Sequence, residues 1–539
     1  MAAQHPDQIA VVAGAGRDRA GKPIYQRLTF AELEKVSNRY AWGLSGAGFR
    51  PGTRVLLLVP AGLPLISLTF ALFKIGCVPI MIDPAMGRRN LAQCIDECAP
   101  DMMIGVPRGH LAQLIFRKAF RTVRRSVLVG SKFLPFGAVN LADLSVPINT
   151  PYPVEPVAAG ETAAILFTTG STGVPKGVIY EHGMFNAQVR LLRDLFKIAE
   201  GEVEMPAFPL FALFNVALGV TSAIPPIDPT RPASCDPAEV VEFMRAQGVT
   251  STFGSPAIWE RVSRYCIDQN IRLPKLRRVL MAGAPVPAHL HERFRHILSD
   301  DADTHTPYGA TEALPVASFS GREVLHARAE HPEPTAGTCV GRPVPEMTLR
   351  IIAISDEPIA DWDAGLGLPP GQIGEICVRG PSVTKAYVAR ARATQLAKIR
   401  DGDAIWHRMG DLGMLDTQGR VWFFGRKSHR VITANGTLFT EPIELIFNRH
   451  PHVFRSALVG VPAGDGFQHP VLIVEPRPEH IPRSKAAAQQ LFNELRALGQ
   501  EFSMSAGIRR FLIHPAFPVD IRHNAKIFRE QLAVWAAKH

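Results

Sequence analysis

The first part of the chain alternates between patterns typical of helices and patterns typical of buried strands. Residues 30–44 predict a helix, with Thr29 as its N-cap and a glutamate three residues later. The apolar runs 55–59 and 78–82 predict buried parallel strands, and residues 63–74 between them predict a helix. This strand–helix–strand rhythm predicts an α/β fold with helices on both faces of a sheet.

The later part of the chain continues this pattern and then becomes richer in strands. Residues 163–167 and 279–281 predict two more buried strands, and residues 348–378 alternate as in a β-rich region. We therefore expect a large N-terminal domain, residues 1–425, of parallel-type sheets flanked by helices with a β-rich subdomain. Residues 426–539 predict a small α+β domain.

One apolar segment, residues 205–227, carries no charge and is long enough to cross a membrane. Four prolines interrupt it, so a buried core segment is the favoured interpretation. The first twelve residues show no basic and apolar signal-peptide pattern. The seven cysteines include no CxxC pair, which favours reduced thiols and a cytoplasmic protein over a metal or redox site.

The net charge of +10 is modest for 539 residues, and the basic side chains are concentrated in one segment. That segment alternates with apolar residues and predicts an amphipathic helix, formed around Arg117, Lys118, Arg121, Arg124 and Arg125. It could contact a membrane surface or an acidic protein, although a solvated helix face is the favoured interpretation. No basic stripe with interleaved aromatics indicates nucleic acid.

The strongest chemical signal directly follows the strand at 163–167. Ten positions, 168–177, carry three glycines and four hydroxyl residues. Glycines let backbone N–H groups approach phosphate oxygens, and a lysine adds charge. Pro175 precedes the lysine where a Walker A loop has glycine. The pattern predicts a phosphate-binding loop of a different kind, with the candidate residues Thr168, Thr169, Gly170, Ser171, Thr172, Gly173 and Lys176.

Further motifs follow this loop in order: 308–312 (Tyr-Gly-Ala-Thr-Glu), 410–413 (Gly-Asp-Leu-Gly), 424–427 (Phe-Gly-Arg-Lys) and 520–527 near the end. Together they resemble the acyl-adenylate-forming superfamily of acyl-CoA synthetases, adenylation domains and luciferases. The resemblance covers nearly the whole chain. It implies ATP and Mg²⁺ as cofactors and residues 426–539 as a mobile lid domain that rotates about residues 426–428.

The resemblance also implies roles for individual residues. Tyr308 would stack on adenine, Thr311 would contact the α-phosphate and Glu312 would hold Mg²⁺ as a hard oxygen ligand. Asp411 would accept hydrogen bonds from the ribose hydroxyls, with Arg426 nearby. The catalytic residues would be Lys526, which bridges the substrate carboxylate and the α-phosphate, together with Glu312 and Thr311. The remaining expected ATP contacts are Gly283, Ala284, Pro285, Gly309 and Ala310.

The acceptor of the activated acyl group is a separate question. Relatives that form CoA thioesters usually carry a glycine-rich turn just past the hinge. Here residues 431–444 retain one glycine, Gly436, followed by the bulky Leu438 and Phe439, and the hinge position is Ser428. These departures favour an acceptor other than CoA without excluding a long-chain fatty-acyl-CoA ligase or a carrier-loading fatty-acyl-AMP ligase.

Four runs, 208–214, 228–233, 306–315 and 425–430, resemble one branch of the superfamily: the β-lactone synthetases of bacterial long-chain olefin biosynthesis. This resemblance implies a 2-alkyl-3-hydroxy long-chain fatty acid as the substrate. Its β-hydroxyl would attack the acyl-adenylate and release AMP, which needs no second substrate because the nucleophile is tethered. It also leaves open a membrane contact or a multi-enzyme olefin-biosynthesis assembly.

In this interpretation an apolar run lines the acyl pocket through Phe208, Phe211, Ala212 and Phe214, although core packing explains these residues equally well. No general base for the hydroxyl is evident. His305, His407 and His429 lie near motifs, but such histidines are more often hydrogen-bonded structural groups. A non-catalytic protein of this fold would have lost Lys176, Glu312 or Asp411, and the chain keeps all three.

Overall fold

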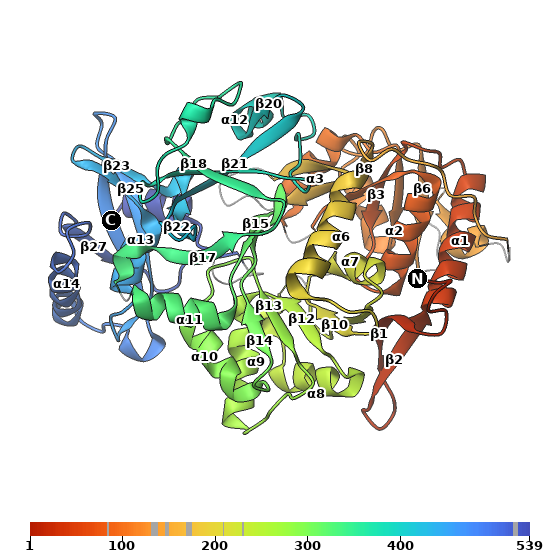
Figure 1. The fold of residues 1–539 in the computed structure, drawn as a ribbon, viewed down its shortest axis with the longest axis horizontal. Helices are drawn as coiled ribbons and strands as arrows, with labels where there is room; N and C mark the ends of the chain where they lie inside the picture. The colour runs from red at the N-terminus through yellow and green to blue at the C-terminus, as the bar shows by residue number, and fades with distance from the viewer. Residues whose placement is uncertain are drawn as a thin grey trace.

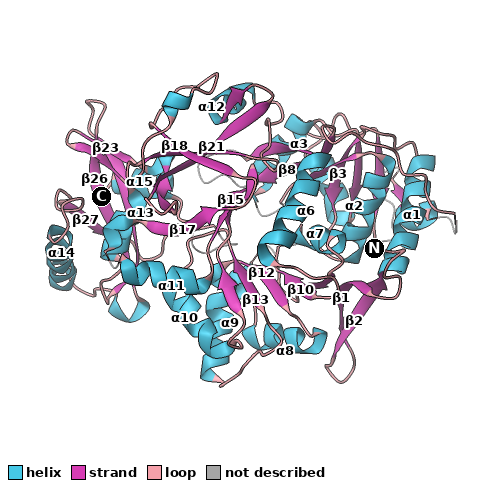
Figure 2. Ribbon diagram, in the orientation of Figure 1, coloured by secondary structure: helices cyan, strands magenta, loops and turns pink. Residues whose placement is uncertain are grey.

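The computed structural model describes residues 1–83, 86–130, 138–145, 150–168, 175–208, 210–228, 231–331, 333–520 and 526–539. Within them lie two seven-stranded sheets, an eight-stranded sheet and two small sheets near the C-terminus. Figures 1 and 2 show the two seven-stranded sheets with their helices beside the third, and the C-terminal part at the opposite end from the N-terminus. The predicted α/β class is confirmed.

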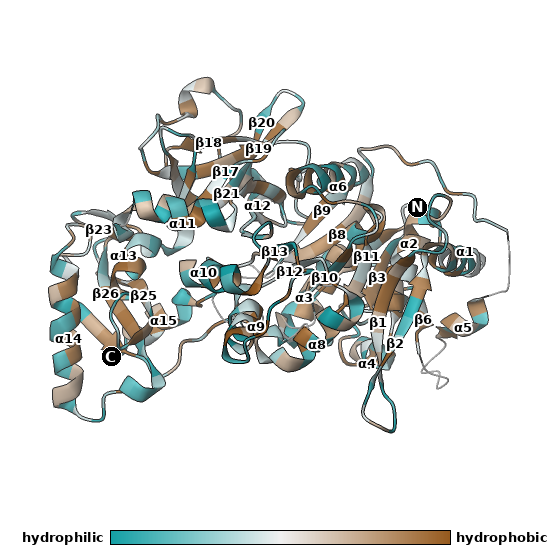
Figure 3. Ribbon diagram, turned by 60° about the horizontal axis from the view of Figure 1, so that its bottom comes forward, coloured by the Kyte–Doolittle hydropathy of each residue, from teal (hydrophilic) through white to brown (hydrophobic). Residues whose placement is uncertain are grey.

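The first sheet has the order β7-β6-β5-β3-β4-β8-β9 and is parallel except for the antiparallel pair β8–β9. Its strands are β3 (Arg54–Leu58), β4 (Val78–Met81), β5 (Met102–Gly105), β6 (Arg125–Leu128), β7 (Val139–Asn140), β8 (Thr162–Thr168) and β9 (Lys176–Glu181). Its short apolar runs are those of a sheet buried on both faces. Figure 3 shows hydrophobic colouring along β3 and β8 in the interior.

Helices cover both faces of this sheet, as the strand–helix–strand rhythm predicts. One face packs against α1 (Phe30–Gly46), α2 (Leu63–Ile75) and α5 (Leu141–Leu144), and the other against α3 (Arg88–Cys98). The helix α4 (Pro107–Ile115) follows β5. Thr29 and Glu32 form the predicted capping box at the start of α1.

The second sheet has the order β14-β13-β12-β10-β11-β1-β2 and is parallel except for the edge pair β1–β2. One face packs against three helices, whose residues share a cluster with the central strands. The strands are β1 (Ile9–Arg17), β2 (Pro23–Thr29), β10 (Val203–Pro206), β11 (Thr221–Ile224), β12 (Ser251–Gly254), β13 (Arg278–Met281) and β14 (Asp303–His305). The helices are α8 (Pro237–Gln247), α9 (Pro256–Asp268) and α10 (Ala288–Ile297).

Two helices, α6 (His182–Phe196) and α7 (Phe211–Ala217), connect the first two sheets. Near its start α6 packs on β8 and β9 through Met184, and near its end Leu192 and Phe196 pack on β12 and β13. Figure 1 shows both helices between the sheets. The strands β12 and β13 pack on these helices in the central region between the two sheets. Ligands bind at the carboxyl ends of the strands in open α/β sheets.

The third sheet is largely antiparallel and forms the β-rich subdomain. Its order is β15-β16-β17-β22-β21-β19-β18, with β20 paired to β21. Its strands are β15 (Tyr308–Ala310), β16 (Ala313–Ser318), β17 (Thr338–Pro343), β18 (Thr348–Ile352), β19 (Gly374–Arg379), β20 (Lys398–Asp401), β21 (Ala404–Leu415) and β22 (Val421–Arg426), and its helices are α11 (Gly321–Glu330) and α12 (Ala391–Ala397). Strands β15, β21 and β22 bring the motifs at 308–312, 411 and 426 into one sheet.

The C-terminal part is an α+β arrangement, as predicted. A three-stranded sheet packs α13 and α14 on one face and α15 on the other. The elements are β23 (Val431–Thr433), β24 (Gly436–Leu438), α13 (Thr440–Phe447), β25 (Val453–Pro462), β26 (Gln468–Pro476), α14 (Lys485–Gln500), β27 (Arg510–Ile513) and α15 (Arg529–Ala536). A domain boundary after residue 425 stays a prediction.

The structure decides two of the ambiguous segments. The apolar run 205–227 divides into a strand, the short helix α7 and another strand, and no helix in the described ranges is long and apolar enough to cross a membrane. The predicted amphipathic helix around Arg117 is wrong: α4 ends at Ile115 and residues 116–122 form turns. Phe120 turns inward and is buried, so the basic side chains do not share one helical face.

Candidate active site

The phosphate-binding loop connects two paired strands. In the β8–β9 hairpin Thr168 is the backbone partner of Lys176, so the loop forms the tip of this hairpin. Thr169, Gly170, Ser171, Thr172 and Gly173 lie outside the described residues. The Lys176 ammonium lies 5.0 Å from the ring centre of Tyr387. Burial lowers the pKa of Lys176, and the charge of Glu312 opposes this shift. The two predicted site residues therefore interact electrostatically.

The motif at 308–312 consists of β15 and the two-residue turn, 311–312, that leads into β16. Gly309 is required there, because a Cβ atom would lie 2.7 Å from the backbone oxygen of Ala313. Ala310 pairs with Ala313 across the turn. The carbonyl of Thr311 accepts a hydrogen bond from the Tyr180 hydroxyl. Glu312 is the next residue. The strand pairing and the Tyr180 hydrogen bond therefore fix the backbone from which its carboxylate extends.

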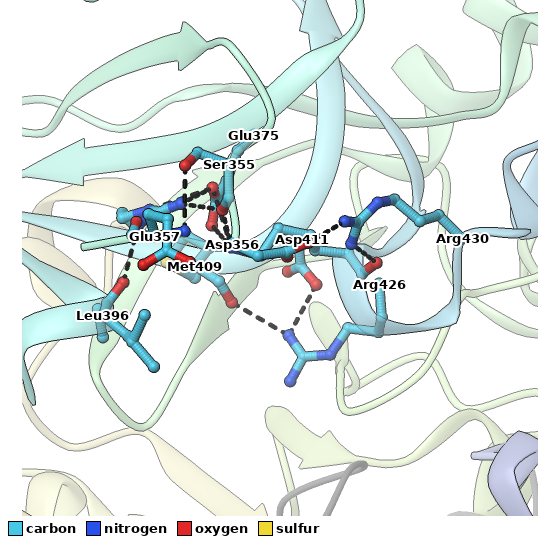
Figure 4. Close-up of polar contacts among 12 residues, drawn as sticks. Ser355, Asp356, Glu357, Glu375, Leu396, Met409, Asp411, Arg426 and Arg430 are labelled. Carbon is cyan, nitrogen blue, oxygen red and sulfur yellow. Dashed lines mark hydrogen bonds and ion pairs between the residues drawn. The ribbon is translucent and has the colours of Figure 1, made fainter. Parts of the chain in front are cut away.

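Tyr308, Asp411 and Arg426 form one hydrogen-bonded cluster. The Tyr308 hydroxyl donates to Asp411 Oδ2 at 2.6 Å. Arg426 Nη1 lies 2.7 Å from Asp411 Oδ1, and Figure 4 shows this contact. Burial and the Asp411 charge raise the pKa of Tyr308. The Asp411 charge also raises the pKa of Arg426. Tyr308 lies 103 positions before Asp411 in the sequence, and the structure brings the two side chains together.

The same view shows a second cluster where β22 leads into the C-terminal part. Glu375 is buried and forms ion pairs with Arg408, at 2.6 Å, and with Lys427, at 3.0 Å (Figure 4). Arg430 forms an ion pair with Asp356 and donates to the Lys427 carbonyl. The segment just after Arg426 is therefore attached to the β-rich subdomain by charges on both sides of Ser428.

Replacement of Glu375 by glutamine is expected to destabilise the protein by about 3–5 kcal/mol, because it leaves the buried Arg408 charge without its partner. Urea unfolding followed by tryptophan fluorescence measures the change. Glu357→Gln is the matched control, since Glu357 pairs with Arg392 at 3.5 Å and both side chains are largely exposed. Equal stability of the two variants would contradict the assigned role of Glu375.

The turn at 282–285 follows β13 at the central region. Ala282 donates its N–H to the Gly254 carbonyl at 3.1 Å, which continues the pairing with β12. Gly283 adopts a φ of 92°, a conformation that favours glycine. The turn that carries Gly283, Ala284 and Pro285 therefore starts at the carboxyl end of the sheet, as expected of an ATP contact.

The predicted pocket residues separate into two groups. Phe208, Phe211 and Phe214 pack together on Phe253, and Phe211 stacks on its ring at 3.9 Å between ring centres. Ala212 is completely buried in another cluster, with Val11 and Phe30 among its neighbours. α7 therefore places Ala212 in a different cluster from the three phenylalanines, and its place in the acyl pocket stays a prediction.

The C-terminal part carries the predicted catalytic lysine and the run that follows Gly436. Lys526 lies beside Ile527, which is buried against α15, and the Lys526 carbonyl accepts the N–H of Asp520 at 2.9 Å. Leu438 packs partly buried in the C-terminal core, and Phe439 contacts the Phe424 ring at 5.9 Å, so the run after Gly436 serves packing.

The three histidines have structural partners. Burial lowers the pKa of His407 well below its usual value, and its Nδ1 lies 3.1 Å from the Ala397 carbonyl oxygen. Burial also lowers the pKa of His305, whose ring contacts Phe196. His429 lies 3.1 Å from Glu530. These environments fit the structural interpretation of all three.

Sequence reasoning missed three residues that surround Glu312. Tyr387 donates its hydroxyl to Glu312 Oε1 at 2.8 Å, Thr384 hydrogen-bonds to the Glu312 carbonyl, and Lys398 donates to Thr384. They lie between β19 and β21, more than 70 positions from Glu312. Lys398 is the first residue of β20, and nothing in the sequence shows that this lysine is buried, so only the structure identifies this group.

Comparison with known proteins decides the family. A profile of the family described as AMP-binding enzyme matches residues 1–388. The chain belongs to the AMP-binding enzyme family. It is 46% identical to the olefin β-lactone synthetase of Xanthomonas campestris pv. campestris over 100% of this chain and 96% of that protein. The olefin β-lactone synthetase of Stenotrophomonas maltophilia gives the same identity and coverage. The chain is accordingly an AMP-forming ligase, and the predicted resemblance is confirmed.

The solved structures of two synthetases have the same fold. An amide bond synthetase of Marinactinospora thermotolerans matches with a TM-score of 0.78 at 24% identity, over 98% of this chain and 97% of that one. The O-succinylbenzoate coenzyme A synthetase of Bacillus subtilis, in complex with AMP, matches with 0.74 at 20% identity, over 98% and 96%. At these identities the likeness concerns the fold.

Proposed function

We propose that this AMP-binding enzyme activates a 2-alkyl-3-hydroxy long-chain fatty acid with ATP and closes it to a β-lactone. The observation that carries the proposal is the 46% identity, along the whole chain, with two olefin β-lactone synthetases. The packing role of the run after Gly436 supports it, because this run lacks the glycine-rich turn expected of a thioester-forming relative.

In the first half-reaction a carboxylate oxygen of the substrate attacks the α-phosphorus of ATP, and pyrophosphate leaves. Asp411 binds the ribose hydroxyls, and Tyr308 and Arg426 orient its two oxygens. Lys176 and Lys526 supply positive charge to the phosphates, where the transition state gains negative charge. The other proposed nucleotide contacts are the loop 168–173, the turn 283–285 and residues 309–311.

Glu312 is the proposed Mg²⁺ ligand. Its Oε1 accepts the Tyr387 hydrogen bond, and Oε2 accepts none from the described residues. One free oxygen on a fixed carboxylate fits a cation that keeps several waters and shares the phosphates. When bound, Mg²⁺ would neutralise phosphate charge. The lysines nearby would add to that effect without occupying the same oxygen.

In the second half-reaction the β-hydroxyl oxygen attacks the acyl carbon. The bond to AMP breaks, the four-membered ring closes, and the hydroxyl proton leaves to solvent or to the departing phosphate. Phe208, Phe211 and Phe214 line the acyl chain in this proposal. Contact with a membrane surface or with other enzymes of an olefin pathway stays a prediction, which rests on the resemblance to the β-lactone synthetases.

Isotope exchange between pyrophosphate and ATP tests the first half-reaction. We expect exchange that requires Mg²⁺ and a long-chain 2-alkyl fatty acid, with or without the 3-hydroxyl, because reversal of adenylation at the carboxylate regenerates ATP from acyl-AMP. A 2-alkyl fatty acid without the hydroxyl serves as a control, since it should still support exchange but form no lactone. Absence of exchange with any long-chain acid would refute the proposed function.

A further inference from the structure

The carboxylate of Glu312 is supported from behind by a short segment that lies between β19 and α12. Thr384 is completely buried and donates both its N–H, at 2.9 Å, and its hydroxyl, at 3.0 Å, to the Glu312 carbonyl oxygen. Three residues later Tyr387 donates its hydroxyl to Glu312 Oε1 at 2.8 Å. The segment therefore holds both the backbone and the side chain of Glu312.

Lys398 holds this segment in turn. It is only 7% exposed, and its ammonium donates to the Thr384 carbonyl and, at 3.2 Å, to the Thr384 hydroxyl oxygen. The same ammonium lies 5.9 Å from the ring centre of Tyr387, on which Lys176 also lies at 5.0 Å. A cation within about 6 Å of an aromatic ring centre is attracted to the ring. Two lysines therefore restrain the ring whose hydroxyl orients Glu312.

The electrostatic environment agrees with this geometry. Burial lowers the pKa of Lys398 to about 7, and the charge that most opposes the shift is that of Glu312. A buried lysine is costly in the absence of compensating contacts. The contacts that compensate for the burial of Lys398 are those with Thr384, which in turn donates to the Glu312 carbonyl.

We propose that Tyr387, Thr384 and Lys398 are positioning residues for Mg²⁺ binding: they hold Glu312 with Oε1 occupied and Oε2 directed to the metal. This inference rests on the proposed role of Glu312. None of the three residues is expected to touch the nucleotide or the acyl substrate. Hydrogen-bonding partners that orient a metal ligand typically affect metal affinity about 10- to 100-fold.

The test compares Tyr387→Phe and Lys398→Met with Lys385→Met in pyrophosphate exchange at varied Mg²⁺ and saturating ATP. Lys385 is the matched control, because it lies in the same segment but is 54% exposed and pairs with Glu181. We expect Tyr387→Phe to raise the Mg²⁺ concentration for half-maximal exchange about 10-fold or more. Lys398→Met should shift it in the same direction, and Lys385→Met should not. The KM for the fatty acid should stay unchanged in all three.

Thermal unfolding of each variant separates this effect from loss of folding. Tyr387→Phe removes one oxygen atom and keeps the ring near both lysines. It therefore tests the positioning role even if Lys398→Met does not fold. An unchanged Mg²⁺ dependence in folded Tyr387→Phe would overturn the positioning role and leave the proposed function intact. Absence of exchange in the wild-type protein would overturn both.

Discussion

Replacement of Lys526 by alanine is expected to slow pyrophosphate exchange about 10²- to 10³-fold, the usual effect of removing one group that stabilises developing charge. The lysine charge would act on the substrate carboxylate and the α-phosphate, so the loss should fall mainly on the rate at saturating ATP. Lys526 follows residues 521–525 and precedes the buried Ile527, which anchors its backbone in the C-terminal core. A change of its side chain should leave the fold intact.

Lys538→Ala is the matched control for this prediction. Lys538 is an exposed lysine just after α15, in the same C-terminal part. We expect it to exchange at the wild-type rate and to unfold at the wild-type temperature. If Lys526→Ala, folded as judged by circular dichroism, exchanged as fast as Lys538→Ala, the assignment of Lys526 as the catalytic lysine would be wrong.

Replacement of Asp411 by alanine is expected to raise the KM for ATP about 100-fold. Two hydrogen bonds from the ribose to a charged group would be lost, each worth about 1.5–3 kcal/mol, and part of this loss is recovered by water. The Arg426 charge would also lose its partner at 2.7 Å. Steady-state pyrophosphate exchange at varied ATP measures the change.

The control for Asp411 is Asp401→Ala in the same sheet. Asp401 pairs with Arg379 at 2.5 Å and is less buried than Asp411, at 30% against 7% side-chain exposure. Asp401 lies outside the proposed nucleotide contacts, so its replacement should leave the KM for ATP near the wild-type value. A similar KM in both variants would show that Asp411 does not bind the ribose.

Much of the fold could be predicted because local signals and tertiary structure agree. Short apolar runs separated by helical patterns become the parallel strands β3 and β4, and the Thr29 capping box forms as expected. The prediction of a helix at the basic segment after α4 was wrong for a physical reason. Burial of the apolar Phe120 side chain in the core is favourable, and this burial is achieved without a continuing helix. Periodicity alone does not show which apolar side chains a neighbouring element will cover.

The candidate site could be predicted where one short motif carries the chemistry. Tyr308, Asp411 and Arg426 belong to such motifs, and the antiparallel register of β21 and β22 brings the last two together. Tyr387 and Lys398 belong to no motif, because their roles depend on a fold that places a distant segment behind Glu312. The sequence does not show that Ala212 joins a different cluster from the phenylalanines, because helical phase, which is open over seven residues, decides this.

The measurement that tests the account most directly is product analysis by mass spectrometry with and without CoA. Purified protein is incubated with ATP, Mg²⁺ and a 2-alkyl-3-hydroxy long-chain fatty acid. We predict equal amounts of AMP and of a product lighter than the substrate by one water molecule, formed at the same rate in both reactions. Product formation only in the presence of CoA, as an acyl-CoA thioester, would contradict the β-lactone synthetase assignment.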